Sequence, residues 1–388
     1  MPNNESRFDE IRPYHNHEVN EVLTKLTEKP SFYALMAYFF PHLSGEAIAE
    51  KFINIKNTHE FQEQIISHAI KRILRESTDR VTISGLENIK KGEAYLFLSN
   101  HRDIILDSAI LNIVLFDMGF GTTRIAIGDN LMVSGLVTDL MKLNKSFVVH
   151  RNVPRNQLYE YSERLSAYIR MSIGEKSSIW LAQKSGRTKD GNDQTSSALM
   201  KMLSLSGGDD FKAGFKALNI VPMTLSYEFE PCDNLKAEEL LCEEAGLDFI
   251  KDDKMSMIRG IREPKGRVHL SIGKPINPQL SQFDHITNRN EFIRHLVELL
   301  DQEIHQLYRL WPSNYIAHDL LNQRRDYTGY YSQEEKEQFR NYLRQRMRGL
   351  KSHPQKLYQK LLSIYAWPVM NKENPKEKFE EEAFIFEV

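Results

Sequence analysis

Residues 94–111 read AYLFLSNHRDIILDSAIL, and this stretch decides the fold. Its first five residues form an unbroken apolar run, which is typical of a buried β-strand. After a short polar turn the apolar residues recur at helical spacing, so a helix follows the strand. A buried strand that leads directly into a helix is the building unit of an α/β sheet.

Short apolar or alternating runs of the same kind recur between amphipathic segments. There are seven of them, at residues 81–83, 94–98, 124–127, 147–149, 179–181, 220–225 and 268–272. Strands that alternate with helices predict an α/β domain with a mostly parallel, mixed sheet flanked by helices. We place this domain at residues 77–280. Residues 1–76 and 281–388 follow helical patterns, and we expect them to form helical annexes at the two ends.

The charges of the chain are nearly balanced. It carries 51 Lys and Arg against 53 Asp and Glu, a net charge of −2 over 388 residues. Because no global positive field exists, a dedicated nucleic-acid-binding function is disfavoured. The two cysteines, Cys232 and Cys242, are too few for a disulfide framework or a zinc knuckle. We expect neither a metal ion nor another cofactor.

The expected location is the cytoplasm, with peripheral association at the inner face of a membrane. Residues 1–6 lack the basic and apolar regions of a signal peptide. The longest apolar run, residues 32–40, has nine residues, whereas a spanning helix needs about 20.

Two stretches could touch lipid, the aromatic-rich residues 31–43 and the basic residues 336–360. For the first, attachment would depend mainly on Phe32, Tyr33, Leu35, Phe39 and Phe40. The alternatives are that residues 31–43 form a core helix and that residues 336–360 form a solvated basic helix.

The polar turn after the strand at residues 94–98 contains the candidate catalytic residues. His101 is a usable general base there, because an imidazole titrates near neutral pH. A carboxylate on one ring nitrogen would fix its tautomer and stabilise the imidazolium, and Asp107 can supply that carboxylate. Asp103 lies three residues after Asn100, at the acidic position of a capping box, so its simplest role is to cap the helix.

The sequence Asn100-His101-Arg102 followed by Asp107 resembles the signature of the glycerolipid acyltransferase superfamily, the glycerol-3-phosphate and 1-acylglycerol-3-phosphate acyltransferases. Three further blocks resemble those of the family in the same order. They are residues 128–131 with 146–151, residues 179–188, and the strand that carries Val221-Pro222. The motif IRPY at residues 11–14 is similar to a bacterial branch of the family.

The resemblance implies transfer of a fatty acyl chain from acyl-CoA or acyl carrier protein to a hydroxyl of a glycerol-phosphate-type acceptor in phospholipid synthesis. His101 would be the general base, with Asp107 preferred over Asp103 as its partner because the following helix continues as in the family. The substrate-binding residues that the resemblance implies are Arg102, Arg151, Lys184, Gly186 and Arg187. Arginines suit the acceptor phosphate because a guanidinium can donate two parallel hydrogen bonds.

Two features depart from the family pattern. Five residues separate His101 from Asp107 where the family has four, and Ser185 stands where the third block carries Glu. The second departure leaves room for acylation of another lipid acceptor, such as the hydroxyl or amine of an amino-lipid. A non-catalytic peripheral lipid-binding protein on the same fold is a further alternative, against which the intact His101 and Asp107 argue.

Overall fold

The computed structural model describes residues 6–132, 134–151, 153–376 and 384–387. Residues 1–5, on which the expectation of no signal peptide depends, lie outside the described part of the chain. The described residues form one sheet of eight strands in the order β4-β3-β5-β2-β6-β7-β1-β8. The strands are β1 (Arg80–Ser84), β2 (Leu96–Ser99), β3 (Arg124–Gly128), β4 (Ser146–Val149), β5 (Ile179–Ala182), β6 (Ile220–Tyr227), β7 (Arg267–Ile272) and β8 (Phe384–Phe386).

Neighbouring strands run parallel except at two places. The β6–β7 and β1–β8 pairs are antiparallel. The predicted α/β class, with a mostly parallel, mixed sheet flanked by helices, is therefore confirmed. All seven predicted strands are present, and β8 was not predicted.

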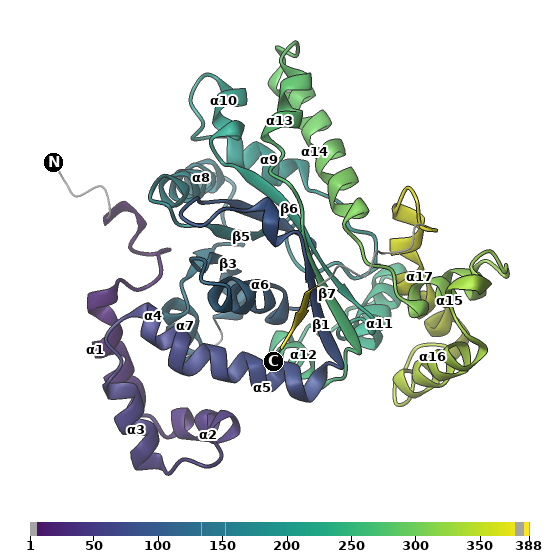
Figure 1. Cartoon of the computed structure of the whole chain (residues 1–388), viewed down its shortest axis with the longest axis horizontal. Coiled ribbons are helices and arrows are strands. Elements are labelled where there is room, and N and C mark those ends of the chain that lie inside the picture. The colour runs from purple at the N-terminus through teal and green to yellow at the C-terminus, as the bar shows by residue number, and fades with distance from the viewer. Residues whose placement is uncertain (1–5, 133, 152, 377–383, 388) are drawn as a thin grey trace.

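The helices surround this sheet (Figure 1). Their bounds are α1 (Asn16–Thr27), α2 (Pro30–Phe39), α3 (Gly45–Ile53), α4 (Thr58–Phe61), α5 (Ser67–Ser77), α6 (Leu106–Asp117), α7 (Gly135–Leu143), α8 (Leu158–Gly174), α9 (Ser197–Ser204), α10 (Phe211–Lys216), α11 (Asp233–Glu244), α12 (Asp253–Arg262), α13 (Asn277–Leu280), α14 (Arg289–Gln306), α15 (Pro312–Leu321), α16 (Gln333–Arg346) and α17 (Pro354–Asn371). A π-helical turn, Gln62–Ile66, joins α4 to α5.

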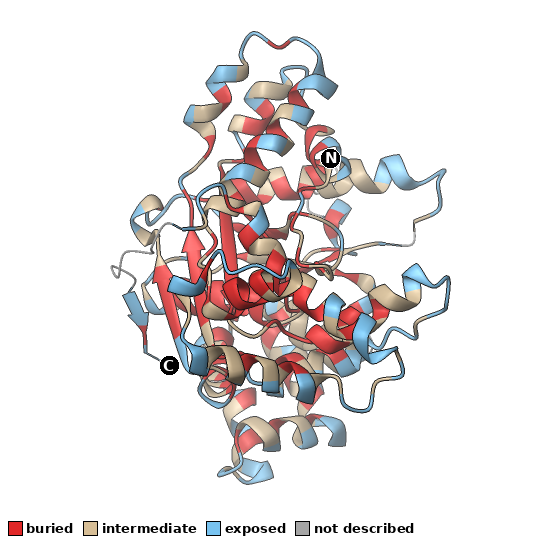
Figure 2. Cartoon of the chain, turned by 90° about the vertical axis from the view of Figure 1, so that its right-hand side faces the viewer, coloured by how far each residue is buried: buried red, intermediate tan, exposed pale blue. Residues whose placement is uncertain are grey.

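Both faces of the sheet are covered, and β2 shows how the sequence achieves this. Leu96 and Leu98 pack into a core with α8, α9 and α14, whereas Phe97 between them packs into a second core with α5 and α6. Successive side chains of a strand point to opposite faces, so an all-apolar strand requires a helical layer on each side. Figure 2 shows the central strands and the helix faces that contact them as buried, whereas β8 at the sheet edge is largely exposed.

The N-terminal helices have a core of their own, and it contains the apolar segment that was expected to touch lipid. Phe32 is completely buried and Phe40 is 3% exposed, in a cluster with residues of α1 and α3. The Phe32 ring lies edge-on to Phe52, with centroids 4.8 Å apart. The expectation that Phe32 and Phe40 contact a membrane is therefore wrong, because α1 and α3 cover the face that carries them.

The C-terminal helices α15, α16 and α17 pack on one another and on α11. Within the basic stretch, Arg346 pairs with Asp233 at 2.6 Å and Lys360 pairs with Glu244. Part of its charge therefore serves to hold helices together. None of the helices in the described residues has the length and apolar character needed to cross a bilayer. The division at residues 77 and 281 remains our proposal, and β8 shows that the C-terminal segment also contributes to the sheet.

Candidate active site

The candidate site lies in the loop between the end of β2 at Ser99 and the start of α6 at Leu106. Strand β2 is central in the sheet, between β5 and β6, and runs parallel to both. Their carboxyl ends therefore meet at one edge, where ligands of such sheets bind. Asn100 anchors the loop, since its amide accepts from Leu225 N at 2.9 Å and donates to Leu225 O at 3.1 Å.

The loop brings His101 and Asp107 together. The Nδ1 atom of His101 lies 2.9 Å from Oδ2 of Asp107, whose side chain is completely buried. The same oxygen accepts hydrogen bonds from the backbone N–H groups of Arg102, at 2.6 Å, and Asp103, at 3.0 Å. Because Nδ1 faces the carboxylate, the geometry leaves Nε2 as the atom that can accept a proton.

Tyr227 completes the surroundings of the carboxylate. Its hydroxyl donates to Oδ1 of Asp107 at 2.8 Å. Burial, followed by the negative charge of Asp107, raises the pKa of Tyr227 well above its ordinary value, so the hydroxyl keeps its proton and remains a donor. Both oxygens of Asp107 are therefore hydrogen-bonded, and the carboxylate is fixed in position.

Asp103 is used differently. Its Oδ1 accepts from the backbone N–H groups of Ile105 and Leu106, each at 2.8 Å, at the start of α6. Asp103 thus satisfies free amides as the sequence suggested, but not in the predicted capping box, because Asn100 bonds to Leu225 and the helix begins only at Leu106. In this structure Asp107, not Asp103, is the carboxylate on the imidazole.

His101 is only partly accessible. Its side chain is 12% exposed, and its ring lies edge-on to Trp180 of β5 with centroids 5.4 Å apart. Its backbone carbonyl accepts from Thr188 N at 2.7 Å. These contacts hold the ring between the β2 loop and the segment after β5, so the first and third sequence blocks meet at the imidazole.

Arg102 occupies a place that does not fit its predicted role as a substrate contact. Its side chain is 4% exposed and pairs with Asp193 at 2.6 Å and Glu230 at 3.3 Å. Tyr308 also donates to Asp193, and Lys236 to Glu230, each at 2.6 Å. A guanidinium enclosed in this network stabilises the loop, and we correct the expectation accordingly.

Lys184, Gly186 and Arg187 follow β5, one strand away from His101. Gly186 has a φ of +77°, which an L side chain rarely adopts, so glycine allows the turn that follows the strand. Lys184 Nζ lies 3.5 Å from Asn192 O. The Nη1 atom of Arg187 is buried without a hydrogen-bond partner among the described residues, which is unusual for a buried guanidinium nitrogen.

Arg151 follows β4, which is separated from β2 by β3 and β5. Its guanidinium lies directly on Gly128 at the end of β3, where a β-carbon would collide with it. Neighbouring strands are about 4.8 Å apart, so this guanidinium at the end of β3 is roughly 10 Å, or two strands, from the strand that carries the catalytic loop, whereas Arg187 follows the adjacent strand. The structure thus places Arg187 closer to His101 than Arg151.

The sequence did not identify Tyr227, Asp193, Glu230 or Trp180 as parts of this site. Each lies between 79 and 128 positions further along the chain than the residue it contacts. Asp193 lies in the run Asp190-Gly191-Asn192-Asp193, which has the composition of a turn and gives no sign of its partner. Only pairing of the strands brings these side chains together.

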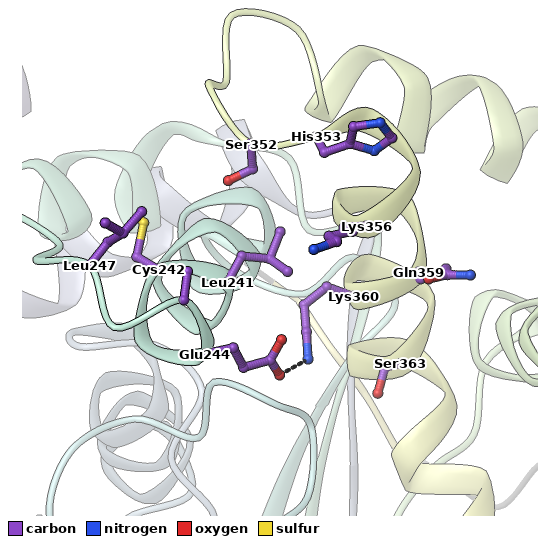
Figure 3. Close-up of a pocket in the computed structure, with 11 residues that line it drawn as sticks. Leu241, Cys242, Glu244, Leu247, Ser352, His353, Lys356, Gln359, Lys360 and Ser363 are labelled. Atoms are coloured by element: carbon purple, nitrogen blue, oxygen red, sulfur yellow. Dashed lines mark hydrogen bonds and ion pairs between the residues drawn. The ribbon is translucent and has the colours of Figure 1, made fainter.

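A separate cavity of about 520 Å³ lies between α11 and α17. Figure 3 shows its lining, with Cys242 and Leu247 on one side and Lys356 and Gln359 on the other. None of its lining residues belongs to the candidate site. Within the described residues, no group of three or more His, Cys, Asp and Glu side chains is placed to hold a metal ion.

Comparison with known proteins gives one match that bears on function. Residues 80–224 match the sequence model of the family described as Acyltransferase. No curated protein matches the chain. Among solved structures, the 1-acyl-sn-glycerophosphate acyltransferase PlsC from Thermotoga maritima has 14% identity over 72% of this chain and 93% of that chain, with a TM-score of 0.34.

A TM-score that low carries no conclusion about this chain. The family match is independent of it and spans β1 to β6, including the catalytic loop. It confirms the resemblance to the glycerolipid acyltransferases that the sequence blocks indicated. Residues 80–224, less than half of the chain, are therefore similar to the Acyltransferase family.

Proposed function

We propose that this protein transfers a fatty acyl chain from an acyl thioester to a hydroxyl of a glycerol-phosphate-type acceptor, with acyl-CoA or acyl carrier protein as donor. The observation that carries the proposal is the 2.9 Å contact between His101 Nδ1 and the buried carboxylate of Asp107. A general base needs an orienting partner and a free second nitrogen, and this pair provides both.

In the proposed reaction, Nε2 of His101 takes the proton from the acceptor hydroxyl while its oxygen attacks the thioester carbonyl. The tetrahedral oxyanion then collapses, the carbon–sulfur bond breaks, and the thiolate takes the proton back from the imidazolium. Asp107 stabilises the imidazolium between these steps. Base catalysis of this kind contributes about 10²- to 10⁴-fold to the rate.

We propose that Arg187 binds the phosphate of the acceptor. It follows the strand next to the catalytic loop, and its Nη1 atom is buried without a partner among the described residues. An unpartnered buried guanidinium nitrogen is unfavourable unless a ligand satisfies it. Arg151, Lys184 and Gly186 follow strands at the same edge and remain candidates for further substrate contacts.

We further propose that the protein works on a membrane surface, at its inner face, since the acceptor and product are lipids. Ile250, Met255 and Ile258, on α12 and the loop before it, are 88%, 43% and 38% exposed. Helix α12 reaches the catalytic edge, because Asp253 at its start accepts from Asn130 and Gly260 contacts Asp103. Exposed apolar residues beside a site of this kind favour lipid contact.

Two measurements test these proposals. Thiol release from palmitoyl-CoA, with glycerol 3-phosphate or its 1-acyl derivative as acceptor, should require His101 and the acceptor together. If thiol release depends on neither His101 nor the acceptor, acyl transfer is excluded and only the lipid-binding alternative remains. For the membrane surface, Ile250→Ser with Met255→Ser should reduce co-sedimentation with phosphatidylglycerol vesicles, and unchanged binding would exclude this face.

A further inference from the structure

A second polar cavity lies at the opposite edge of the sheet. Its volume is about 500 Å³, and it is bounded by the IRPY segment at residues 11–14 and by the starts of the strands β3, β4 and β5. Parallel strands of four or five residues separate it from the catalytic loop by roughly 13 to 17 Å. The proposed function uses neither this cavity nor the IRPY motif.

Cations dominate its lining. Arg12, Arg124 and Lys145 all face the cavity, and Glu175 is the only carboxylate among the described residues that line it. Arg12 is neutralised by Asp9 and Glu18, at 2.7 and 2.6 Å. Arg124 pairs with Glu175 at 3.1 Å.

Lys145 has no such partner. Its ammonium donates to Thr122 Oγ1 at 2.7 Å, and within the described residues no carboxylate lies at ion-pair distance from it. Burial, with the nearby charge of Arg124, lowers the pKa of Lys145 to about 8. A cation in this position is unfavourable in the empty protein and would be stabilised by an anion in the cavity.

The backbone conformation at Lys145 is shared with a second lysine, which serves as a comparison. Lys145 has a φ of +59°, a conformation that lysine rarely adopts. Lys176, with a φ of +61°, forms an equivalent turn before β5, but its side chain is exposed to solvent. The turn alone therefore does not direct a lysine side chain inward, and at Lys145 the side chain is half-buried and lines the cavity.

We propose that this cavity binds a phosphate group, held by Lys145 and Arg124. Its volume lies within the usual range of small-molecule sites. A phosphate anion would pair with Lys145, and Arg124, which already pairs with Glu175, and the Tyr168 hydroxyl lie on the same lining. The group belongs either to a soluble phosphorylated compound or to a lipid headgroup. The inference does not depend on the proposed acyl transfer.

Calorimetric titration of the full chain with inorganic pyrophosphate tests the proposal. Lys145→Met and Lys145→Gln should each weaken binding about ten-fold or more, whereas the matched control Lys176→Met should bind as the wild type does. Acyl transfer in all three should remain near wild-type, because the cavity lies at the other edge of the sheet. Arg187→Ala serves as the control for phosphate binding at the catalytic edge.

Loss of pyrophosphate binding in Arg187→Ala, with Lys145→Met unaffected, would overturn the inference. A measurement on the wild type avoids any folding defect of the variants: pyrophosphate should protect Lys145, and not Lys176, from reductive methylation detected by mass spectrometry. Absence of protection would also overturn it. Repeating the titration with phosphatidate vesicles, with and without Lys145→Met, separates a lipid headgroup from a soluble phosphate.

Discussion

Replacing Asp107 with Asn is the change that best separates the catalytic carboxylate from its structural role. The carboxylate accepts three hydrogen bonds at Oδ2 and one, from Tyr227, at Oδ1. An amide can keep its oxygen toward His101 and turn its nitrogen toward Tyr227, whose hydroxyl can accept as well as donate. Packing is therefore retained, and the main loss is the negative charge beside the imidazole.

The magnitude follows from that charge. A hydrogen bond to a charged group contributes about 1.5 to 3 kcal/mol, or roughly 10- to 150-fold in rate. The loss of kcat cannot exceed the full contribution of the general base, which is about 10²- to 10⁴-fold. We expect kcat for thiol release in Asp107→Asn to fall within these bounds, with the Michaelis constants of both substrates nearly unchanged.

Asp103→Asn is the matched control, because an Asn side chain can still cap Ile105 and Leu106 at the start of α6. Its kcat should stay within about three-fold of wild type, since the lost group does not touch the imidazole. Both variants should be compared at the same folded fraction, checked by circular dichroism. Equal losses in the two variants, or full activity in Asp107→Asn, would refute the assignment of the pair.

Three further changes test the acceptor site, the packing beside the catalytic loop and the core of the N-terminal helices. Arg187→Ala should raise the Michaelis constant for a phosphorylated acceptor about 10- to 150-fold and leave that of the donor unchanged; the reverse pattern would place the phosphate elsewhere. Gly260→Ala should lower the free energy of unfolding by about 1 to 3 kcal/mol in urea titrations, because the new methyl group collides with Asp103. The control Gly174→Ala, whose methyl group meets nothing within 4 Å, should not lower it, and equal effects would contradict this packing. Phe32→Ala should lower the free energy of unfolding by about 3 to 5 kcal/mol without weakening vesicle binding. Weaker vesicle binding with an unchanged free energy of unfolding would instead show that this side chain contacts the membrane.

The main elements of the sheet could be predicted because each strand is an apolar run between polar turns. The exception, β8, has three residues and pairs with β1, about 300 positions earlier in the chain. A run of three apolar residues resembles any isolated apolar patch. It forms a strand only because the edge of β1 is available to pair with it. Pattern analysis therefore could not have separated it from the helical annex predicted for residues 281–388.

The candidate site shows the same limit for side chains. His101 in the loop and Asp107 in the first turn of α6 are only six positions apart, so the sequence could suggest their pairing. The surroundings of Arg102 could not be predicted, since Asp193 and Glu230 lie 91 and 128 positions away. For Phe32 the sequence allowed a core position and a lipid contact equally, and the packing of α1 and α3 decides between them.

The central claim is that His101 acts as the general base of acyl transfer, and its most direct test is a single measurement. Thiol release from palmitoyl-CoA with a saturating acceptor is followed for the wild type and for His101→Ala, with the fold checked by circular dichroism. We predict that the folded variant loses about 10²- to 10⁴-fold in kcat. A folded His101→Ala variant that transfers the acyl chain at the wild-type rate would contradict the account.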